Sequence, residues 1–170
     1  IVRDLNTTSS IKDPRGVKVA GVIGADLLSQ FVTTIDPVSA EVLLEDPSQT
    51  SPLSASTGVI QLRRAGVGGA RFLLRASIQD RAGWWLLDTG ARGSHVDGRK
   101  YDIEPTSSKE GAWIQGTGGQ GGQRQDLYFF DEATVVLAGH AVGGLRLVER
   151  KHGPFGFDLL GLNVVGHYRI

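Results

Sequence analysis

The sequence predicts an all-β protein built from short strands that are joined by tight turns. Glycine accounts for 24 of the 170 residues, and short apolar segments alternate with Gly, Pro, Ser and Asp along the chain, which is typical of all-β folds. Residues 71–79 alternate apolar and polar side chains with the period of two that a half-buried strand requires. Residues 25–31 carry apolar side chains at helical spacing and predict a helix of one to two turns.

The bulk composition is that of a globular protein and excludes several classes of function. The chain has 18 basic and 18 acidic residues and no net charge, so no basic surface argues for nucleic acid or for an anionic membrane. No apolar run reaches the length of a membrane-spanning helix. Cysteine is absent, which excludes disulfides and thiolate chemistry. A chain of this length forms one medium domain, or a small domain plus part of another.

The first part of the chain, residues 1–46, ends at a segment that reads as a linker. Residues 47–57 are rich in proline and serine, as expected of a domain boundary. Asp36-Pro37 predicts a turn between two strands. The strands expected before the boundary are residues 1–5, 17–24, 32–35 and 40–44.

The second part, residues 58–170, contains most of the expected strands. Asp80 to Gly83 predicts a turn between two of them. Residues 92–110 are polar and read as an excursion without a regular element. The strands expected here are residues 59–63, 71–79, 84–87, 127–130, 134–138 and 145–148, and a further short strand begins at Ala112 and runs into a glycine-rich tip.

One stretch within the second part combines a buried strand with a carboxylate. The apolar residues 84–87 run directly into Asp88, and Thr89-Gly90 then bends the chain. A partly desolvated carboxylate costs several kcal/mol unless it is protonated, hydrogen-bonded or sharing a proton. Such a position suggests chemistry, although an ordinary aspartate that caps a turn would give the same pattern.

The closing segment repeats an earlier one. Residues 22–28 (VIGADLL) and residues 159–165 (LLGLNVV) share two apolar residues, a glycine, an Asp or Asn and two aliphatic residues. Phe31 falls opposite Tyr168 in the same register. This similarity indicates an internal duplication of which the first copy is only partly present.

Together these motifs resemble one lobe of a retropepsin-like or pepsin-like aspartic protease, and the bacterial two-lobe relatives are the most similar. The similarity rests on the strand that ends in Asp-Thr-Gly-Ala, the glycine-rich hairpin after it and the apolar-apolar-Gly segment before a short helix. It implies a closed barrel lobe for residues 58–170, with a short helix after the apolar-apolar-Gly segment. Residues 1–46 would be the C-terminal part of a preceding lobe.

The resemblance also assigns roles to individual residues. Asp88 matches the catalytic aspartate, Thr89 the residue whose hydroxyl locks two active-site turns together, and Gly90 the glycine of close approach. Leu159-Leu160-Gly161 matches the segment packed behind the active-site turn. The residues expected to contact substrate, in the turn and in a flap over residues 113–122, are Ala91, Trp113, Ile114, Gly116, Gly118 and Gly119.

The implied activity is hydrolysis of peptide bonds in a peptide or protein substrate, without metal or cofactor. Two aspartates a few ångströms apart share one proton, and the ionised one activates the attacking water. The chain contains a single Asp-Thr-Gly, so the second aspartate would come from a missing upstream lobe or from a second copy of the chain. Because position 1 is not Met, we expect the chain to begin inside a longer gene product. The first residues do not resemble a signal peptide. The resemblance implies a bacterial periplasmic or secreted location.

Other readings of the sequence compete with this one. A non-catalytic binding or dimerisation domain could have kept the lobe fold together with its aspartate. Residues 116–121 match G-x-G-x-x-G, but neither a helix nor a suitably placed acidic residue follows, which excludes a dinucleotide site. Ser94 and His95 are adjacent and would point to opposite faces of a strand, so they do not form a hydrolase pair. The four histidines lack metal-site spacing, and the three tryptophans could line a cleft or fill the core.

Overall fold

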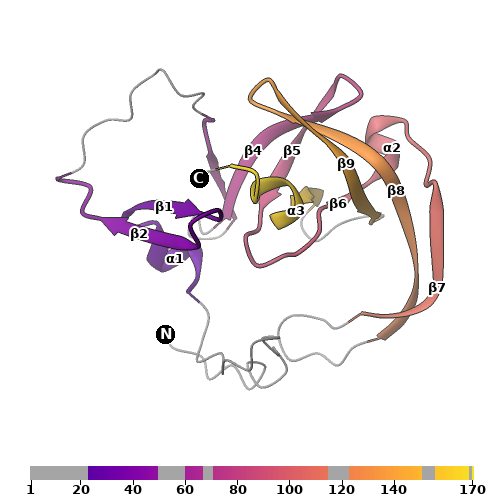
Figure 1. Ribbon diagram of the computed structural model, residues 1–170, viewed down its shortest axis with the longest axis horizontal. Helices are drawn as coiled ribbons and strands as arrows, with labels where there is room; N and C mark the ends of the chain where they lie inside the picture. The colour runs from indigo at the N-terminus through magenta and orange to yellow at the C-terminus, as the bar shows by residue number, and fades with distance from the viewer. Residues whose placement is uncertain (1–22, 50–59, 67–70, 115–122, 151–155, 169) are drawn as a thin grey trace.

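A computed structural model describes residues 23–49, 60–66, 71–114, 123–150, 156–168 and 170, and this part of the chain is mostly β-sheet (Figure 1). The sheets are accompanied by three helices of four residues each among these residues. The all-β prediction is therefore confirmed at the level of fold class. The strand expected at residues 1–5 and most of the one at 17–24 lie outside the described residues.

Eight strands form one large sheet in the order β3-β4-β5-β10-β6-β9-β8-β7, and β8 also pairs with β4. Consecutive strands joined by tight turns pair antiparallel, as in β4–β5 and β8–β9. The strand bounds are β3 Arg63–Ala65, β4 Arg71–Ile78, β5 Arg81–Leu87, β6 His95–Val96, β7 Ser107–Ile114, β8 Gln123–Leu137, β9 His140–Glu149 and β10 Asp158–Leu160. Helix α2 (Gly98–Tyr101) follows β6, and helix α3 (Leu162–Val165) follows β10.

A smaller unit precedes the large sheet. It consists of helix α1 (Ala25–Leu28) and the antiparallel pair of strands β1 (Val32–Asp36) and β2 (Glu41–Glu45), which lie beside the large sheet in Figure 1. The end of the chain joins the two parts, because Ile35 and Ile170 exchange backbone hydrogen bonds of 2.5 and 2.9 Å. Strand β1 therefore continues its pairing onto the segment that follows α3.

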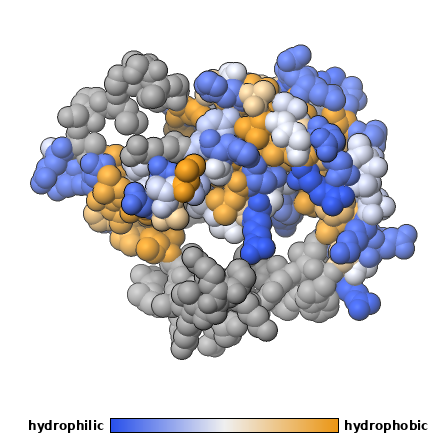
Figure 2. Space-filling view, in the orientation of Figure 1, coloured by the Kyte–Doolittle hydropathy of each residue, from blue (hydrophilic) through white to orange (hydrophobic). Residues whose placement is uncertain are grey.

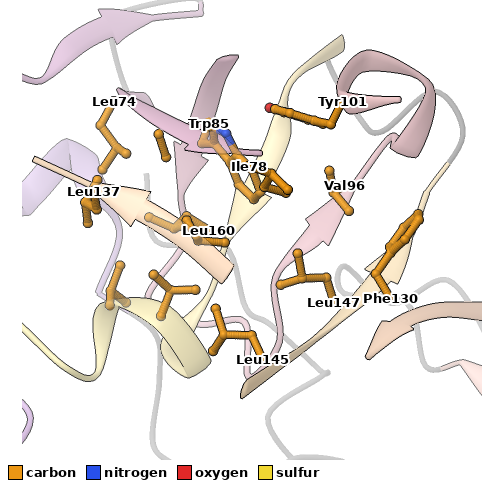
Figure 3. Packing of buried hydrophobic residues seen from close by; sticks show 14 residues of the cluster. Leu74, Ile78, Trp85, Val96, Tyr101, Phe130, Leu137, Leu145, Leu147 and Leu160 are labelled. Atoms are coloured by element: carbon orange, nitrogen blue, oxygen red, sulfur yellow. The ribbon is translucent and has the colours of Figure 1, made fainter. Parts of the chain in front are cut away.

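The hydrophobic core consists of apolar side chains that several strands of the large sheet contribute. In β4 the side chains of Leu74, Ala76 and Ile78 are buried, which agrees with the alternation that predicted this strand. They pack with Trp85 and with Leu160 of β10, and Figure 3 shows side chains from several strands converging there. Of the three tryptophans, Trp85 is thus a core residue. Burying such an aromatic side chain stabilises the fold by roughly 2–3 kcal/mol.

The structure corrects several boundaries and one larger expectation. Residues 92–110 are not an irregular excursion, because they contain β6, α2 and the start of β7. The strand expected at residues 59–63 is β3, which begins only at Arg63, and α1 ends at Leu28 rather than at residue 31. The two strands expected at 127–130 and 134–138 form one long strand, β8, whose pairing is interrupted by irregularities near Glu132.

Candidate active site

The candidate site lies at the turn that follows β5, and β10 supports this turn from behind. Strand β10 pairs parallel with β5 on one side and antiparallel with β6 on the other. It therefore lies between the strand that enters the turn and the strand that leaves it. Leu160 of β10 is opposite Leu87, the residue before Asp88. A turn held by a third strand in this way has little freedom to move.

Hydrogen bonds fix Asp88 within the turn. Its backbone N–H donates to the carbonyl of Leu160 at 3.0 Å, and its own carbonyl accepts from the Ala91 N–H at 3.2 Å. The backbone N–H of Gly90 donates to Asp88 Oδ1 at 2.9 Å. The carboxylate is partly buried, and its second oxygen, Oδ2, receives no hydrogen bond from the described residues. The turn therefore positions a carboxylate that can still act on another group.

Gly161 allows the chain after β10 to approach the turn closely. A Cβ atom at this position would lie 2.5 Å from the Gly93 carbonyl oxygen and 2.8 Å from that of Ala91. The first two N–H groups of α3 then donate to the turn, Leu162 to the Ala91 carbonyl at 2.8 Å and Asn163 to the Arg92 carbonyl at 3.1 Å. Leu159-Leu160-Gly161 thus packs behind the turn, in the position expected from the sequence.

Ser94 supports the turn, a role that the sequence does not predict. Its side chain is fully buried. Its hydroxyl donates to Asn163 Oδ1 at 2.7 Å and accepts from the Gly161 N–H at 2.9 Å. Because this buried hydroxyl both donates and accepts a hydrogen bond, it connects the end of the turn to the start of α3. No pattern in the sequence marks this role, because the partners are far apart along the chain.

A pocket of about 570 Å³ opens in front of the turn. Asp88, Thr89 and Gly90 line one side, and Gly24 and Ala25 of the smaller unit line the other. Asp88 is the single carboxylate among the residues that line it, and the remainder of the lining is largely apolar. The hydroxyl of Thr89 has no hydrogen-bond partner among the described residues. The structure therefore brings Asp88, Thr89 and Gly90 together beside the first copy of the internal repeat.

The remaining predicted contact residues are less fully described. Ala91 belongs to the turn and is occupied there by its backbone contacts, and it does not line the pocket. Trp113 and Ile114 end β7 and pair with residues 124 and 123 of β8, so the strands on either side of the predicted flap tip pair antiparallel. The residues expected at its tip, Gly116, Gly118 and Gly119, lie outside the described residues.

His95 is a partly buried histidine in the segment that follows the turn. It opens β6, directly opposite Leu159, and its Nδ1 atom is buried without a hydrogen-bond partner in the described structure. Burial lowers the pKa of this imidazole, the positive charge of Arg150 lowers it further, and the charge of Asp88 opposes both effects. The fold therefore favours a neutral His95.

We expect His95 to make the protein less stable in mild acid. Because its pKa is lower in the folded state than the ordinary value of about 6.5, the unfolded chain binds the proton more readily below that pH. The free energy of unfolding should then fall as the pH drops from about 6.5 toward the folded pKa, by about 1.4 kcal/mol per unit of pKa difference. Urea unfolding at pH 7.5 and pH 5 measures this loss.

Two variants separate this effect from other titrations. His95→Gln should lose less stability than the wild type between the two pH values, whereas His140→Gln, which changes an exposed side chain, should behave as the wild type does. The hydrogen bond from Arg99 holds the pKa of Asp97 below its ordinary value. Protonation of this carboxylate therefore lowers the stability only at a more acidic pH than the two compared here. Equal losses of unfolding free energy in His95→Gln and in the wild type would contradict the prediction that His95 causes the loss.

A buried polar network anchors the start of β10. The buried carboxylate of Asp158 accepts hydrogen bonds from the Tyr101 hydroxyl at 2.8 Å and from the Asp97 backbone N–H at 2.9 Å, and Lys100 Nζ lies 3.2 Å away. Burial, together with the charge of Asp158, raises the pKa of Tyr101 far above its ordinary value, so its hydroxyl stays protonated. The network connects α2 to the strand that supports the turn, and no pattern in the sequence predicts it.

No protein-family model and no curated protein matches this chain. Within the described residues there is no group of three or more His, Asp or Glu side chains arranged to hold a metal ion. None of the helices in this part of the chain is long and apolar enough to cross a membrane. The Asp88 turn and the pocket in front of it are therefore the features from which a function can be inferred.

Proposed function

We propose that this chain is part of an aspartic endopeptidase in which Asp88 is one of two catalytic aspartates. The observation that carries the proposal is the Asp88 turn itself, which is clamped between β5, β6 and β10 and faces a largely apolar pocket. A carboxylate with one oxygen held by a backbone N–H and the other unpaired is suited to activate water. A retropepsin-like lobe for residues 58–170 and the closing part of another lobe for residues 1–46 are consistent with this arrangement.

The chemistry follows from placing a second carboxylate within a few ångströms of Asp88. Two such groups cannot both ionise, so one keeps a proton that the pair shares. The ionised group takes a proton from a water that attacks the peptide carbonyl, and the protonated group supports the developing oxyanion and then serves the leaving amine. The titration belongs to the pair. Residues 113–122 would close over an extended substrate as a flap and exclude bulk water.

A second candidate function is peptide binding without catalysis. What favours it is that Asp88 is the single carboxylate among the described residues that line the pocket. On this reading the pocket and the hairpin of β7 and β8 would hold a peptide that is never cleaved. The two candidates differ in the affinity expected for the transition state, which an endopeptidase binds more tightly than the substrate.

Binding of a transition-state analogue by the full-length protein distinguishes them. A peptide whose scissile carbonyl is replaced by a tetrahedral carbon bearing a hydroxyl should bind an aspartic endopeptidase at least about 100-fold more tightly than the parent peptide. A site that only binds peptides has no reason to prefer the analogue. Isothermal titration calorimetry of the two peptides measures the ratio, and equal affinities would contradict the proposed function.

A further inference from the structure

Arg146 shows how this protein holds an exposed arginine in place. Its guanidinium carbon lies over the Phe129 ring, 4.4 Å from the centroid, and its Nε atom lies 2.6 Å from Asp131 Oδ1. A guanidinium can stack on an aromatic ring and bind a carboxylate with its N–H groups at the same time. Arg146 therefore has both an aromatic partner and an anionic partner within its own chain.

Arg63 and Arg75 have the aromatic partner without the anionic one. Both guanidinium groups lie over the ring of Trp84, with distances to the centroid of 5.6 and 5.4 Å. Both arginines are exposed, and neither forms an ion pair or a side-chain hydrogen bond with any described residue. Two like charges that share one ring repel each other, and a bound anion would offset this repulsion. The pair is therefore suited to bind an anion.

The strand register explains why these side chains meet. Arg75 of β4 is directly opposite Trp84 of β5, so their side chains lie on the same face of the sheet. Arg63 of β3 is opposite Leu73, which precedes Arg75 by two residues on β4, so Arg63 shares that face. The side chain of Arg63 reaches across β4 to lie over Trp84. Arg63, Arg75 and Trp84 are called the paired-arginine site below.

The sequence around this site is basic, although the whole chain carries no net charge. Residues 47–79 contain four arginines and no acidic residue. One of them, Arg64, lies over the ring of Phe72 at 5.8 Å. Acidic residues stand at both ends of β5, Asp80 directly before it and Asp88 directly after it. A short segment with one or two carboxylates fits between these charges, whereas a long polyphosphate would be repelled by them.

The free edge of β3 favours an extended peptide as the source of the carboxylate. Strand β3 is last in the order of the large sheet and pairs with β4 alone among the described strands. Its backbone makes no hydrogen bond to any other described segment. Such an edge can accept an added strand, whose backbone binds the edge while alternate side chains contact one face. An acidic side chain on that face would lie next to Arg63.

We propose that the paired-arginine site binds an acidic segment of a partner polypeptide, in extended conformation along β3. A carboxylate of the segment is held by the guanidinium groups of Arg63 and Arg75 as Asp131 is held by Arg146. The site goes beyond the proposed function, because it does not use the Asp88 carboxylate. Trp84 precedes Asp88 by four residues, or about 13 Å of extended strand.

A second exposed surface is apolar and would not select acidic residues. Apolar side chains gather over α1, β1 and β2 in Figure 2, and Val42 of β2 is 62% exposed. Strand β2 begins at Glu41 and ends at Glu45, whose charges would repel an acidic peptide. Binding of a peptide to this surface would depend on Val42, so Val42→Ser identifies it.

Fluorescence anisotropy with a labelled peptide tests the paired-arginine site. The probe alternates Glu and Val over six residues, and its counterpart carries Gln in place of each Glu. At low salt the full chain should bind the Glu peptide at least about tenfold more tightly than the Gln peptide. This preference should shrink at about 0.5 M salt, which screens the charges. Arg63→Gln and Arg75→Gln should each weaken binding of the Glu peptide at least about fivefold.

Three variants make the result specific to the site. Arg81→Gln removes the same charge from β5, but Arg81 already pairs with Asp102 at 3.1 Å, so this variant should bind as the wild type does. Val42→Ser should also bind as the wild type does. Arg75→Lys keeps the charge and loses the planar guanidinium, so it should bind the Glu peptide less tightly than the wild type. Urea unfolding checks that each variant is folded.

Several results would overturn this proposal. One is equal affinity of the wild type for the Glu and Gln peptides. Another is unchanged binding of the Glu peptide by folded Arg63→Gln and Arg75→Gln, or an equal loss in Arg81→Gln. Loss of binding in Val42→Ser would assign the peptide to the apolar surface. Tighter binding of a labelled oligothymidylate than of the Glu peptide would make the partner a nucleic acid instead.

Discussion

Replacing Gly161 with Ala is expected to destabilise the large sheet by about 3 kcal/mol. The added methyl group would lie 2.5 and 2.8 Å from two backbone carbonyl oxygens of the Asp88 turn, and backbone atoms cannot move aside as a flexible side chain can. Separating the two segments would also stretch the hydrogen bonds from Leu162 and Asn163 to the turn. Buried donors that lose their acceptors are costly.

Gly24→Ala is the matched control for this substitution. Gly24 and Gly161 precede equivalent helices with similar backbone angles, φ −90° and φ −100°, so alanine is equally acceptable to the backbone at both positions. Among the described residues, the atoms near Gly24 belong to the exposed side chain of Asp26, and the change should cost less than about 1 kcal/mol. Urea unfolding followed by tryptophan fluorescence, to which buried Trp85 contributes, measures the stability of both variants. Equal losses would contradict the close packing of Gly161 on the turn.

The strands with regular apolar patterns were predictable from the sequence. In β4 the alternation of Leu74, Ala76 and Ile78 follows directly from burial of one face of a sheet. The repeated apolar-apolar-Gly segments predicted where α1 and α3 begin, since both helices start immediately after the glycine. These features depend on neighbours in sequence, so local reasoning recovers them.

The segment between Arg92 and Glu110 could not be predicted in the same way. Its folding depends on polar groups that are buried because distant residues satisfy them, and such pairs leave no periodic pattern. Ser94 pairs with Asn163, and Asp97 and Tyr101 meet Asp158. A polar residue that is buried with its partners looks in the sequence like a residue of an exposed loop.

The sequence predicts two strands in place of the long strand β8, because charged residues interrupt its apolar pattern. Asp131 and Glu132 stand where the pairing with β9 shifts register, and Glu132 has a φ of 56°. A local irregularity of this kind lets a strand continue while its side chains change face. Asp131 is held there by Ser107 and Arg146, which are separate from it in sequence.

The sequence predicts the Asp88 turn at the candidate site, but it does not predict which other residues border the pocket. Asp88, Thr89 and Gly90 stand out in the sequence because an apolar strand leads into a carboxylate and a sharp bend. That the first copy of the repeat borders the same pocket required the structure, because the pairing of Ile35 with Ile170 brings the two parts together.

Asp88→Asn is expected to reduce peptide-bond cleavage by the full-length protein at least about 10³-fold. An amide cannot take the proton of the attacking water or share a proton with a second carboxylate. The asparagine oxygen can still accept the hydrogen bond that Gly90 donates at 2.9 Å, so the turn and the fold should be kept. The loss would then reflect chemistry rather than unfolding.

Asp80→Asn is the matched control. Asp80 has a positive φ of 65° in the turn between β4 and β5, a conformation that asparagine also tolerates, and it does not line the pocket in front of Asp88. This variant should cleave peptides at the rate of the wild type. If all three proteins have the same urea unfolding curve, a lower cleavage rate in Asp88→Asn reflects the lost carboxylate and not a loss of folding.

The rate of cleavage of an extended peptide, compared between wild type, Asp88→Asn and Asp80→Asn from acid to neutral pH, tests most directly whether Asp88 is a catalytic aspartate. We predict cleavage within the peptide by the wild type and by Asp80→Asn, and a loss of at least about 10³-fold in Asp88→Asn at every pH. Equal rates in the wild type and in a folded Asp88→Asn variant would contradict this account and remove Asp88 from the mechanism.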